Sequence, residues 1–193
     1  TLTGTVAPIA GLYVPPPSAK FLATDGTRLI MAGAWETSAS AGQTTPTPRR
    51  VWFTRPIGAT DAGDDEAITQ TADSRYHLDI NDPAGGEITG LASTGGLVYV
   101  FTAESMWRLV PTGATDTPYR AEQISGSVGA VSQYAVCLGG VDAAGATDDA
   151  VYFVSQFAGF YRYTPSRGVE WLGKDYIPAG SVWALSTMQL CYD

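Results

Sequence analysis

The densest group of oxygen ligands in the chain is the stretch DAGDDE, residues 61–66, which contains Asp61, Asp64, Asp65 and Glu66. Calcium is bound by several carboxylate and carbonyl oxygens, which acidic loops often supply. The order of acidic residues around the glycine does not match an EF-hand, so we interpret the stretch as a solvated loop and keep calcium binding as the alternative. The pair Asp148-Asp149 is interpreted likewise, as a charged hairpin tip.

His77 is the single histidine of the chain, and a catalytic triad or a histidine-containing zinc site would have to include it. It alternates with Tyr76 and Leu78 in the stretch SRYHLDI, and no catalytic motif surrounds it. We therefore interpret His77 as a structural or surface histidine. Cys137 and Cys191 are too few for a zinc site without further ligands and are expected to be buried free thiols, with a disulfide as the alternative.

Sequence signatures of the common catalytic folds do not occur in this chain. It contains no phosphate-binding loop, no dinucleotide fingerprint and no nucleophile elbow. The Ser-x-Asp-x-Gly-x-x-Trp box of sialidase propellers is also missing. A pair of carboxylates for glycoside hydrolysis needs no motif and stays open. We assign no catalytic, metal-binding or cofactor-binding residue, and we expect a protein that is not an enzyme and needs no cofactor.

Aromatic residues are the other candidates for a binding site, because stacked rings can hold a sugar. The candidates lie in strand-like stretches, and we expect them to belong to the core between repeats more often than to a sugar-stacking surface: Trp52, Trp107, Tyr161, Tyr163 and Trp171. Arg108 and Arg162 each follow a repeated aromatic by one position, so they point to the opposite sheet face. We expect them to form ion pairs between neighbouring repeats.

Composition and charge narrow the class of protein. Of 193 residues, 45% are hydrophobic and 16% are charged, which is typical of a globular chain. The net charge of −8 argues against a protein that grips nucleic acid through its phosphates, since that requires clustered lysine and arginine. No apolar run is long enough to span a membrane.

The elements that must position these residues are repeated β-hairpins. Trp52, Trp107 and Tyr161 recur at intervals of 55 and 54 residues, each as the second residue of a short apolar stretch. A second apolar stretch precedes each one, as VYVF does at 98–101 and VYFV at 151–154. Asp25-Gly26 and Gly95-Gly96 are strong hairpin turn signals, because such turns require positive φ angles.

Flanking strands bring each repeat to four strands. The repeats cover residues 19–80, 88–124 and 130–173, a fourth begins at SVWALS (181–186) and runs to residue 193, and residues 1–18 are an extension or linker. The polar stretch 36–48 is predicted to be a long exposed hairpin loop, because it has no apolar periodicity.

Both faces of the inner strands are expected to be covered, because VYVF and VYFV do not alternate between apolar and polar residues. Tyr99, Phe101, Tyr152 and Phe153 should therefore be almost fully buried. The period is close to that of propeller blades, about 40–50 residues. We predict an all-β fold of propeller-like, four-stranded antiparallel blades, about three and a half of them, with a β-sandwich as the alternative.

These residues resemble a known family. Three stretches resemble sequence motifs in tail structural proteins of short-tailed bacteriophages, of the tail hub or nozzle type built on a β-propeller. They are ITGLASTGGLVYVFTAESMWRL (88–109), the continuation through VYFVSQFAGFYRYTP (151–165), and RRVWFTRPIG (49–58). The similar region spans about residues 20–176. The family supplies no catalytic residues to carry over.

The resemblance implies a non-enzymatic virion protein located in the phage tail and assembled in the cytoplasm of the bacterial host. Its implied partners are other copies of itself in a ring, the adaptor or portal, and tail fibre or spike proteins. DNA would pass through such a ring without tight binding. A carbohydrate-binding or glycan-hydrolysing propeller that takes part in receptor recognition is the alternative function.

Overall fold

The computed structural model describes residues 18–37, 44–54, 56, 76–84, 86–140, 149–156 and 159–172. Within these ranges the chain forms twelve strands in three four-stranded antiparallel sheets, together with one short 3-10 helix, Gln133–Ala135. The all-β class and the four-stranded antiparallel units predicted from the sequence are confirmed. The expected strands over 181–193 and all but Ser18 of the N-terminal extension lie outside the described residues.

Each sheet is a simple meander, in which every strand pairs with the next one along the chain. Sheet A contains β1 (Phe21–Thr24), β2 (Leu29–Thr37), β3 (Thr44–Phe53) and β4 (His77–Asp79). Sheet B contains β5 (Ile88–Thr94), β6 (Leu97–Thr102), β7 (Met106–Pro111) and β8 (Tyr119–Ser125). Sheet C contains β9 (Val136–Leu138), β10 (Val151–Ser155), β11 (Gly159–Thr164) and β12 (Gly168–Trp171).

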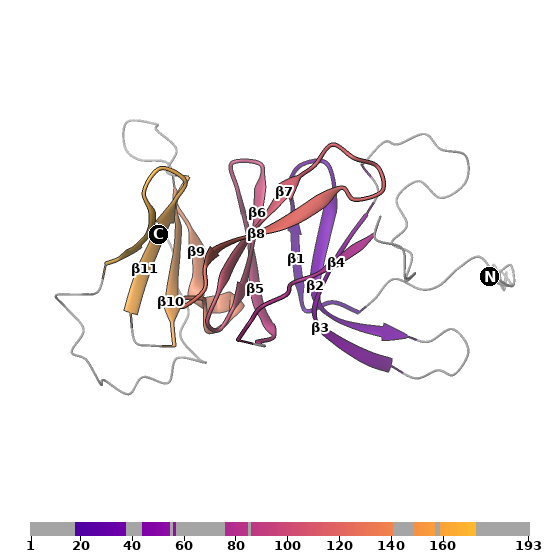
Figure 1. Cartoon of the computed structure of the whole chain (residues 1–193). Coiled ribbons are helices and arrows are strands. Elements are labelled where there is room, and N and C mark those ends of the chain that lie inside the picture. Colours follow the sequence, from indigo (N-terminus) through magenta and orange to yellow (C-terminus); the bar gives the residue numbers. More distant parts are fainter. Residues whose placement is uncertain are drawn as a thin grey trace, which may run out of the picture.

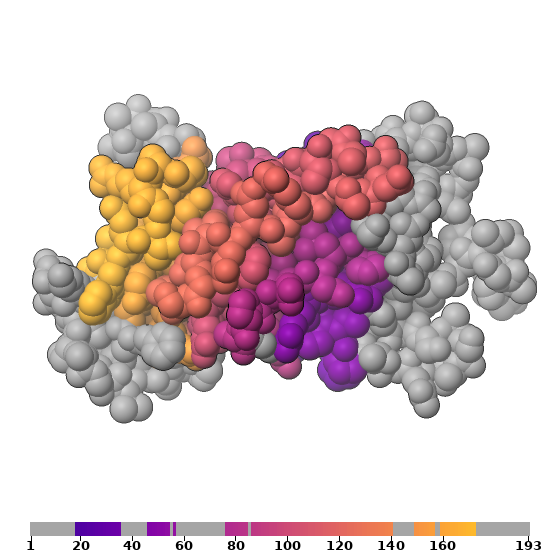
Figure 2. All heavy atoms as spheres, viewed as in Figure 1, coloured from indigo at the N-terminus to yellow at the C-terminus, as the bar shows by residue number. Residues whose placement is uncertain are grey.

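The three sheets follow one another in chain order, from sheet A through sheet B to sheet C (Figure 1). The first strands β1, β5 and β9 are neighbours in this arrangement, and β8 lies beside both β4 and β12. In the space-filling view the coloured atoms of the three sheets adjoin without a break (Figure 2). The described strands therefore form three layers, whereas a sandwich has two.

Short turns close the first hairpin and the β5–β6 hairpin where the sequence predicts them, with four residues between Thr24 and Leu29 and two between Thr94 and Leu97. Thr94 pairs with Leu97, and the intervening Gly95 and Gly96 have φ angles of 59° and 72°, which glycine adopts without a steric penalty. In the first hairpin, Asp25 stabilises the turn through its side chain, because its Oδ1 accepts the backbone N–H of Thr27 at 2.8 Å.

Apolar side chains fill the two spaces between the sheets. One core lies between sheets A and B and includes Ile30, Val51, Phe53, Val100 and Leu109, among others. The second core lies between sheets B and C. Its buried members are Ala92, Tyr99, Phe101, Met106, Ala130, Val151, Phe153 and Tyr163.

The predicted burial of the inner strands is confirmed at Tyr99, Phe101 and Phe153, which are at most 1% exposed. The prediction is wrong at Tyr152, which is only partly buried. Tyr152 alternates with Val151 and Phe153, both of which face sheet B, so its side chain lies on the opposite face of sheet C.

The prediction of a long loop over residues 36–48 is also wrong. β2 continues to Thr37 and β3 begins at Thr44, so Glu36 pairs with Thr45 and Thr37 pairs with Thr44. This part of the hairpin projects from the stack of sheets, below and to the right in Figure 1. Residues 38–43 lie outside the described residues.

Two local features account for this projecting arm. Gly33 has a φ angle of 62° beside a register shift between Ala32 and Ala34, which bends the ladder as a bulge does. Trp35 exchanges both backbone hydrogen bonds with Ser18, at 2.8 and 3.1 Å. Its opposite partner Pro46 therefore turns its nitrogen to the outer edge of β3, where a proline costs no ladder bond.

No helix among the described residues has the length and apolar character needed to cross a membrane.

Candidate functional site

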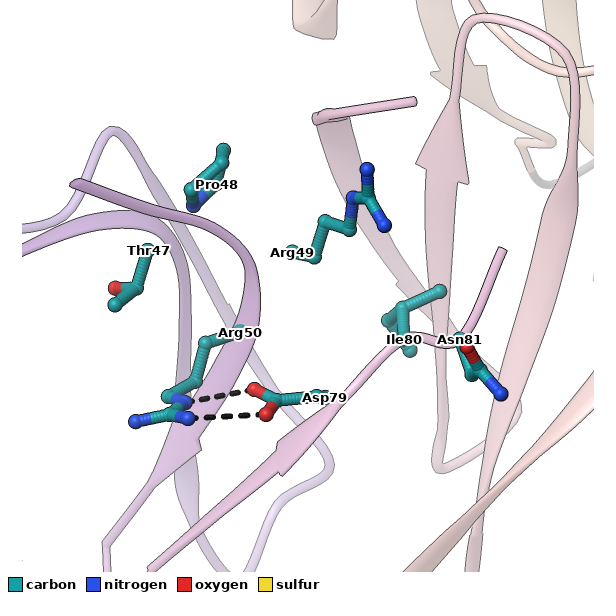
Figure 3. A pocket seen from close by; sticks show the side chains of 7 residues that line it. All are labelled: Thr47, Pro48, Arg49, Arg50, Asp79, Ile80 and Asn81. Carbon is teal, nitrogen blue, oxygen red and sulfur yellow. Dashed lines mark hydrogen bonds and ion pairs between the residues drawn. The ribbon is translucent and has the colours of Figure 1, made fainter. Parts of the chain in front are cut away.

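A cavity of about 500 Å³ opens on sheet A, between β3 and the segment that leaves β4 (Figure 3). It is lined by Thr47, Pro48, Arg49, Arg50, Asp79, Ile80 and Asn81. In the close-up, the side chains of Arg49 and Arg50 diverge, and Asp79 faces Arg50 (Figure 3).

Arg50 and Asp79 form a bidentate pair at the wall of this cavity. They lie directly opposite each other in the β3–β4 ladder, and Arg50 donates Nε to Oδ1 at 2.7 Å and Nη2 to Oδ2 at 2.9 Å. The hydrogen bond from Arg50 lowers the pKa of Asp79, partial burial opposes this effect, and the charges of Arg50 and His77 add to the lowering. Asp79 is therefore a carboxylate at neutral pH.

Trp52 and His77 extend this arrangement along the same two strands. Their ring centroids are 4.9 Å apart with an interplanar angle of 47°, and the Arg50 guanidinium lies over the Trp52 ring at 5.7 Å. Trp52 is 1% exposed and packs with Met31 and Tyr76. The structure thus places His77 in a row of packed side chains, beside the tilted ring of Trp52.

The lining of the cavity offers polar groups that could bind a ligand. Its lining residues offer guanidinium, carboxylate, amide and hydroxyl groups, which suit a small polar ligand, but they include no nucleophile held by a base. Among the described residues no group of three or more His, Cys, Asp or Glu side chains could hold a metal ion. The acidic stretch 61–66 and Asp148 lie outside the described residues; Asp149 is described and exposed.

A second polar cluster is buried where the chain passes from sheet A to sheet B. Thr102 and Ser105 each donate a hydroxyl hydrogen bond to Asp82 Oδ2 at 2.9 Å. The indole N–H of Trp107 donates to Ser105 Oγ at 2.6 Å, and the N–H of Ala84 donates to the other carboxylate oxygen at 3.0 Å. Asp82, Thr102 and Ser105 are at most 4% exposed.

This cluster ties the tight turn between β6 and β7 to the connection between the sheets. Gly129, on the connection to sheet C, packs directly on the same turn: a Cβ added there would lie 2.1 Å from Thr102 O and 2.6 Å from Ser105 N. The cluster contains a serine and a carboxylate but no histidine, and its hydroxyls are satisfied within it. It is therefore a structural clamp.

The prediction that Arg108 and Arg162 form ion pairs between repeats is wrong. Arg108 binds Glu122 at 2.6 Å and Arg162 binds Glu170 at 2.5 Å, each within its own sheet. The partners are directly opposite one another in the β7–β8 and β11–β12 ladders. Cross-strand neighbours on one face are close enough to pair, whereas the next sheet is a full layer away.

The candidate aromatics occupy different settings. Trp107 belongs to the core between sheets A and B, and Tyr161 and Tyr163 pack in the core between sheets B and C. Trp171 is 46% exposed and stacks on Tyr161, with ring centroids 6.3 Å apart. Trp52 is buried among residues of sheet A on the face away from sheet B. The expectation of a core between repeats thus fits Trp107, Tyr161 and Tyr163, and it does not fit Trp52 or Trp171.

The expected burial of Cys137 is wrong, since this free thiol on the edge strand β9 is only partly buried. Cys191, for which burial was also expected, lies outside the described residues.

Sequence reasoning did not identify Arg50, Asp79, Asp82 or Ser105. The paired charges of Arg50 and Asp79 could have been found by extending the ladder from Trp52 and His77, which are directly opposite each other. No signal of this kind exists for Asp82, because its partners lie 20 and 23 residues away in the chain.

No protein-family model matches the chain, and a search of curated proteins finds no significant match.

Proposed function

We propose that the three sheets are consecutive blades of a propeller-like body and that the protein is a non-enzymatic structural component of a phage tail hub or nozzle. The observation that carries the proposal is the chain-order stacking of three meander sheets with their first strands side by side. Propeller blades are four-stranded sheets arranged in this way around an axis. The sequence resemblance to tail proteins of short-tailed phages supplies the biological setting.

In this proposal copies of the protein form a ring in the virion tail, next to the adaptor or portal and to fibre or spike proteins. The ring seals the genome channel and conducts DNA during ejection. The net charge of −8 supports this role, because like-charge repulsion lets DNA slide past without adhesion. Assembly takes place in the cytoplasm of the host bacterium.

The test uses antibodies raised against the purified chain, applied to intact virions of the source phage and viewed by electron microscopy. Gold label confined to the tail is expected. Gold label on the capsid shell rejects the tail assignment. So do particles that carry no label although their mass spectra contain the chain. A filter-binding titration at low salt, where phosphate contacts are strongest, checks the channel role, and submicromolar DNA affinity contradicts it.

Carbohydrate binding is the second candidate, favoured by the half-exposed Trp171 that stacks on Tyr161. A flat exposed indole suits a sugar ring. A glycan array probed with the intact chain and with Trp171→Ala separates the two functions: binding that is lost in the variant favours a receptor-recognition role, and no binding favours the structural one. A glycosidase assay beside it tests hydrolysis.

A further inference from the structure

A row of three side chains crosses sheet B on the face that meets sheet C. Tyr99, Arg108 and Glu122 lie directly opposite one another on β6, β7 and β8. The phenol of Tyr99 meets Tyr163 of sheet C, with ring centroids 5.3 Å apart and an interplanar angle of 61°. In sheet B, this row is therefore part of the interface with the following sheet.

Sheet C carries the same row one repeat later. Tyr152, Arg162 and Glu170 are opposite one another on β10, β11 and β12, and Arg162 binds Glu170 at 2.5 Å. This row lies on the face of sheet C turned away from sheet B, and the side chains of Arg162 and Glu170 are 27% and 32% exposed. Figure 1 shows sheet C as the last of the coloured sheets.

Chain spacing indicates which segment comes next. β5 begins 9 residues after β4 ends, and β9 begins 11 residues after β8 ends. β12 ends at Trp171, so equal intervals place another first strand at residues 180–182. The apolar stretch SVWALS occupies residues 181–186.

Strand neighbours indicate where that segment would dock. Because β1 lies beside β5 and β5 lies beside β9, another first strand belongs beside β9. Cys137 lies on β9 directly opposite Tyr152, so it shares the face that carries the row. Trp183 and Leu185 alternate in the segment and would share one strand face, as an apolar contact requires.

We infer that the outer face of sheet C, defined by Cys137, Tyr152, Arg162 and Glu170, is a docking surface for residues 181–193 of the same chain, which add the first strands of a fourth sheet. The inference rests on the stacking of repeated sheets proposed above. It does not depend on the phage-tail role, which has its own test on virions.

Hydrogen exchange of the intact 193-residue chain, measured by mass spectrometry, tests the inference directly. The amides of 181–186 should be protected, and the protection should disappear when Trp183 and Leu185 are both changed to serine. Leu22→Ser is the matched control, since it alters an apolar side chain of sheet A that is 63% exposed.

Thiol reactivity provides the second measurement. In a Cys191→Ser background Cys137 is the single thiol, and an aromatic disulfide reagent should modify it roughly tenfold more slowly in the intact chain than in the Trp183→Ser, Leu185→Ser variant. Equal rates together with unprotected amides overturn the inference. Protection that rises with protein concentration, with dimers in sedimentation, also overturns it, because a second copy would then occupy the face.

Discussion

Phe101 of β6 and Phe153 of β10 meet in the core between sheets B and C, with ring centroids 5.3 Å apart. Both side chains are 0% exposed. Removal of either ring leaves a cavity in a closely packed interior, so Phe101→Ala and Phe153→Ala should each lower the free energy of unfolding by about 3–5 kcal/mol. Urea unfolding followed by tryptophan fluorescence measures this loss.

A matched surface change sets the scale for that measurement. Leu22→Ala removes an apolar side chain that is 63% exposed, and should change the free energy of unfolding by less than about 0.5 kcal/mol. Phenylalanine variants that lose under about 1 kcal/mol would show that the two sheets are not packed through these rings.

Asp82 should contribute more to stability than any exposed carboxylate, because three buried or partly buried donors converge on it. Asp82→Ala leaves the hydroxyls of Thr102 and Ser105 without their acceptor inside the protein, at a cost of about 1–3 kcal/mol. Glu87, which is exposed, provides the control variant Glu87→Ala. Equal unfolding midpoints for the two variants in urea would contradict the clamp.

A substitution of Gly129, which packs on the turn between β6 and β7, tests the same region. Gly129→Ala places a Cβ 2.1 Å from the backbone oxygen of Thr102, which cannot move without disturbing β6. A loss of about 1–3 kcal/mol or more is expected from thermal or urea unfolding. At Gly126 an added Cβ approaches only the amide end of the flexible Gln123 side chain, so Gly126→Ala should be tolerated.

The hairpins and the three four-stranded sheets were predictable because the same apolar hairpin pattern recurs along the sequence. The equivalence of Trp107 with Tyr161 and the turn at Gly95-Gly96 follow from local sequence, since hairpin pairing is a short-range property. Burial was predicted correctly only for side chains on a sheet face that a neighbouring sheet covers, such as Phe101 and Phe153. Tyr99 and Tyr152 occupy equivalent positions, and only Tyr99 has a following sheet against it in the described structure.

The partners of the charged residues could not be predicted, because they depend on register. Arg108 faces Glu122 only because the register of the β7–β8 ladder shifts between Met106 and Trp107. No residue pattern in the sequence predicts this shift. The arm of β2 and β3 was missed for a related reason. Its pairing follows from the bulge at Gly33, whereas its polar composition is typical of a loop.

The last prediction concerns alkaline pH. Burial raises the pKa of Tyr99 to about 12, with further contributions from the nearby Tyr163, and the pKa of Tyr119 is raised by burial and by its hydrogen bond to Asp25. A group whose pKa is higher in the folded state stabilises the fold below its unfolded pKa, which is 10.0 for tyrosine. That contribution is lost as the pH rises from 10 towards 12.

We therefore expect unfolding above pH 10 to coincide with late ionisation of phenols, which absorbance at 295 nm and circular dichroism follow in the same titration. Tyr99→Phe removes one of the groups that must ionise, so its alkaline unfolding midpoint should shift to higher pH. Tyr134→Phe removes a phenol that is 67% exposed and serves as the control. If both variants unfold at the pH of the unmodified chain, burial of Tyr99 between sheets B and C does not limit alkaline stability.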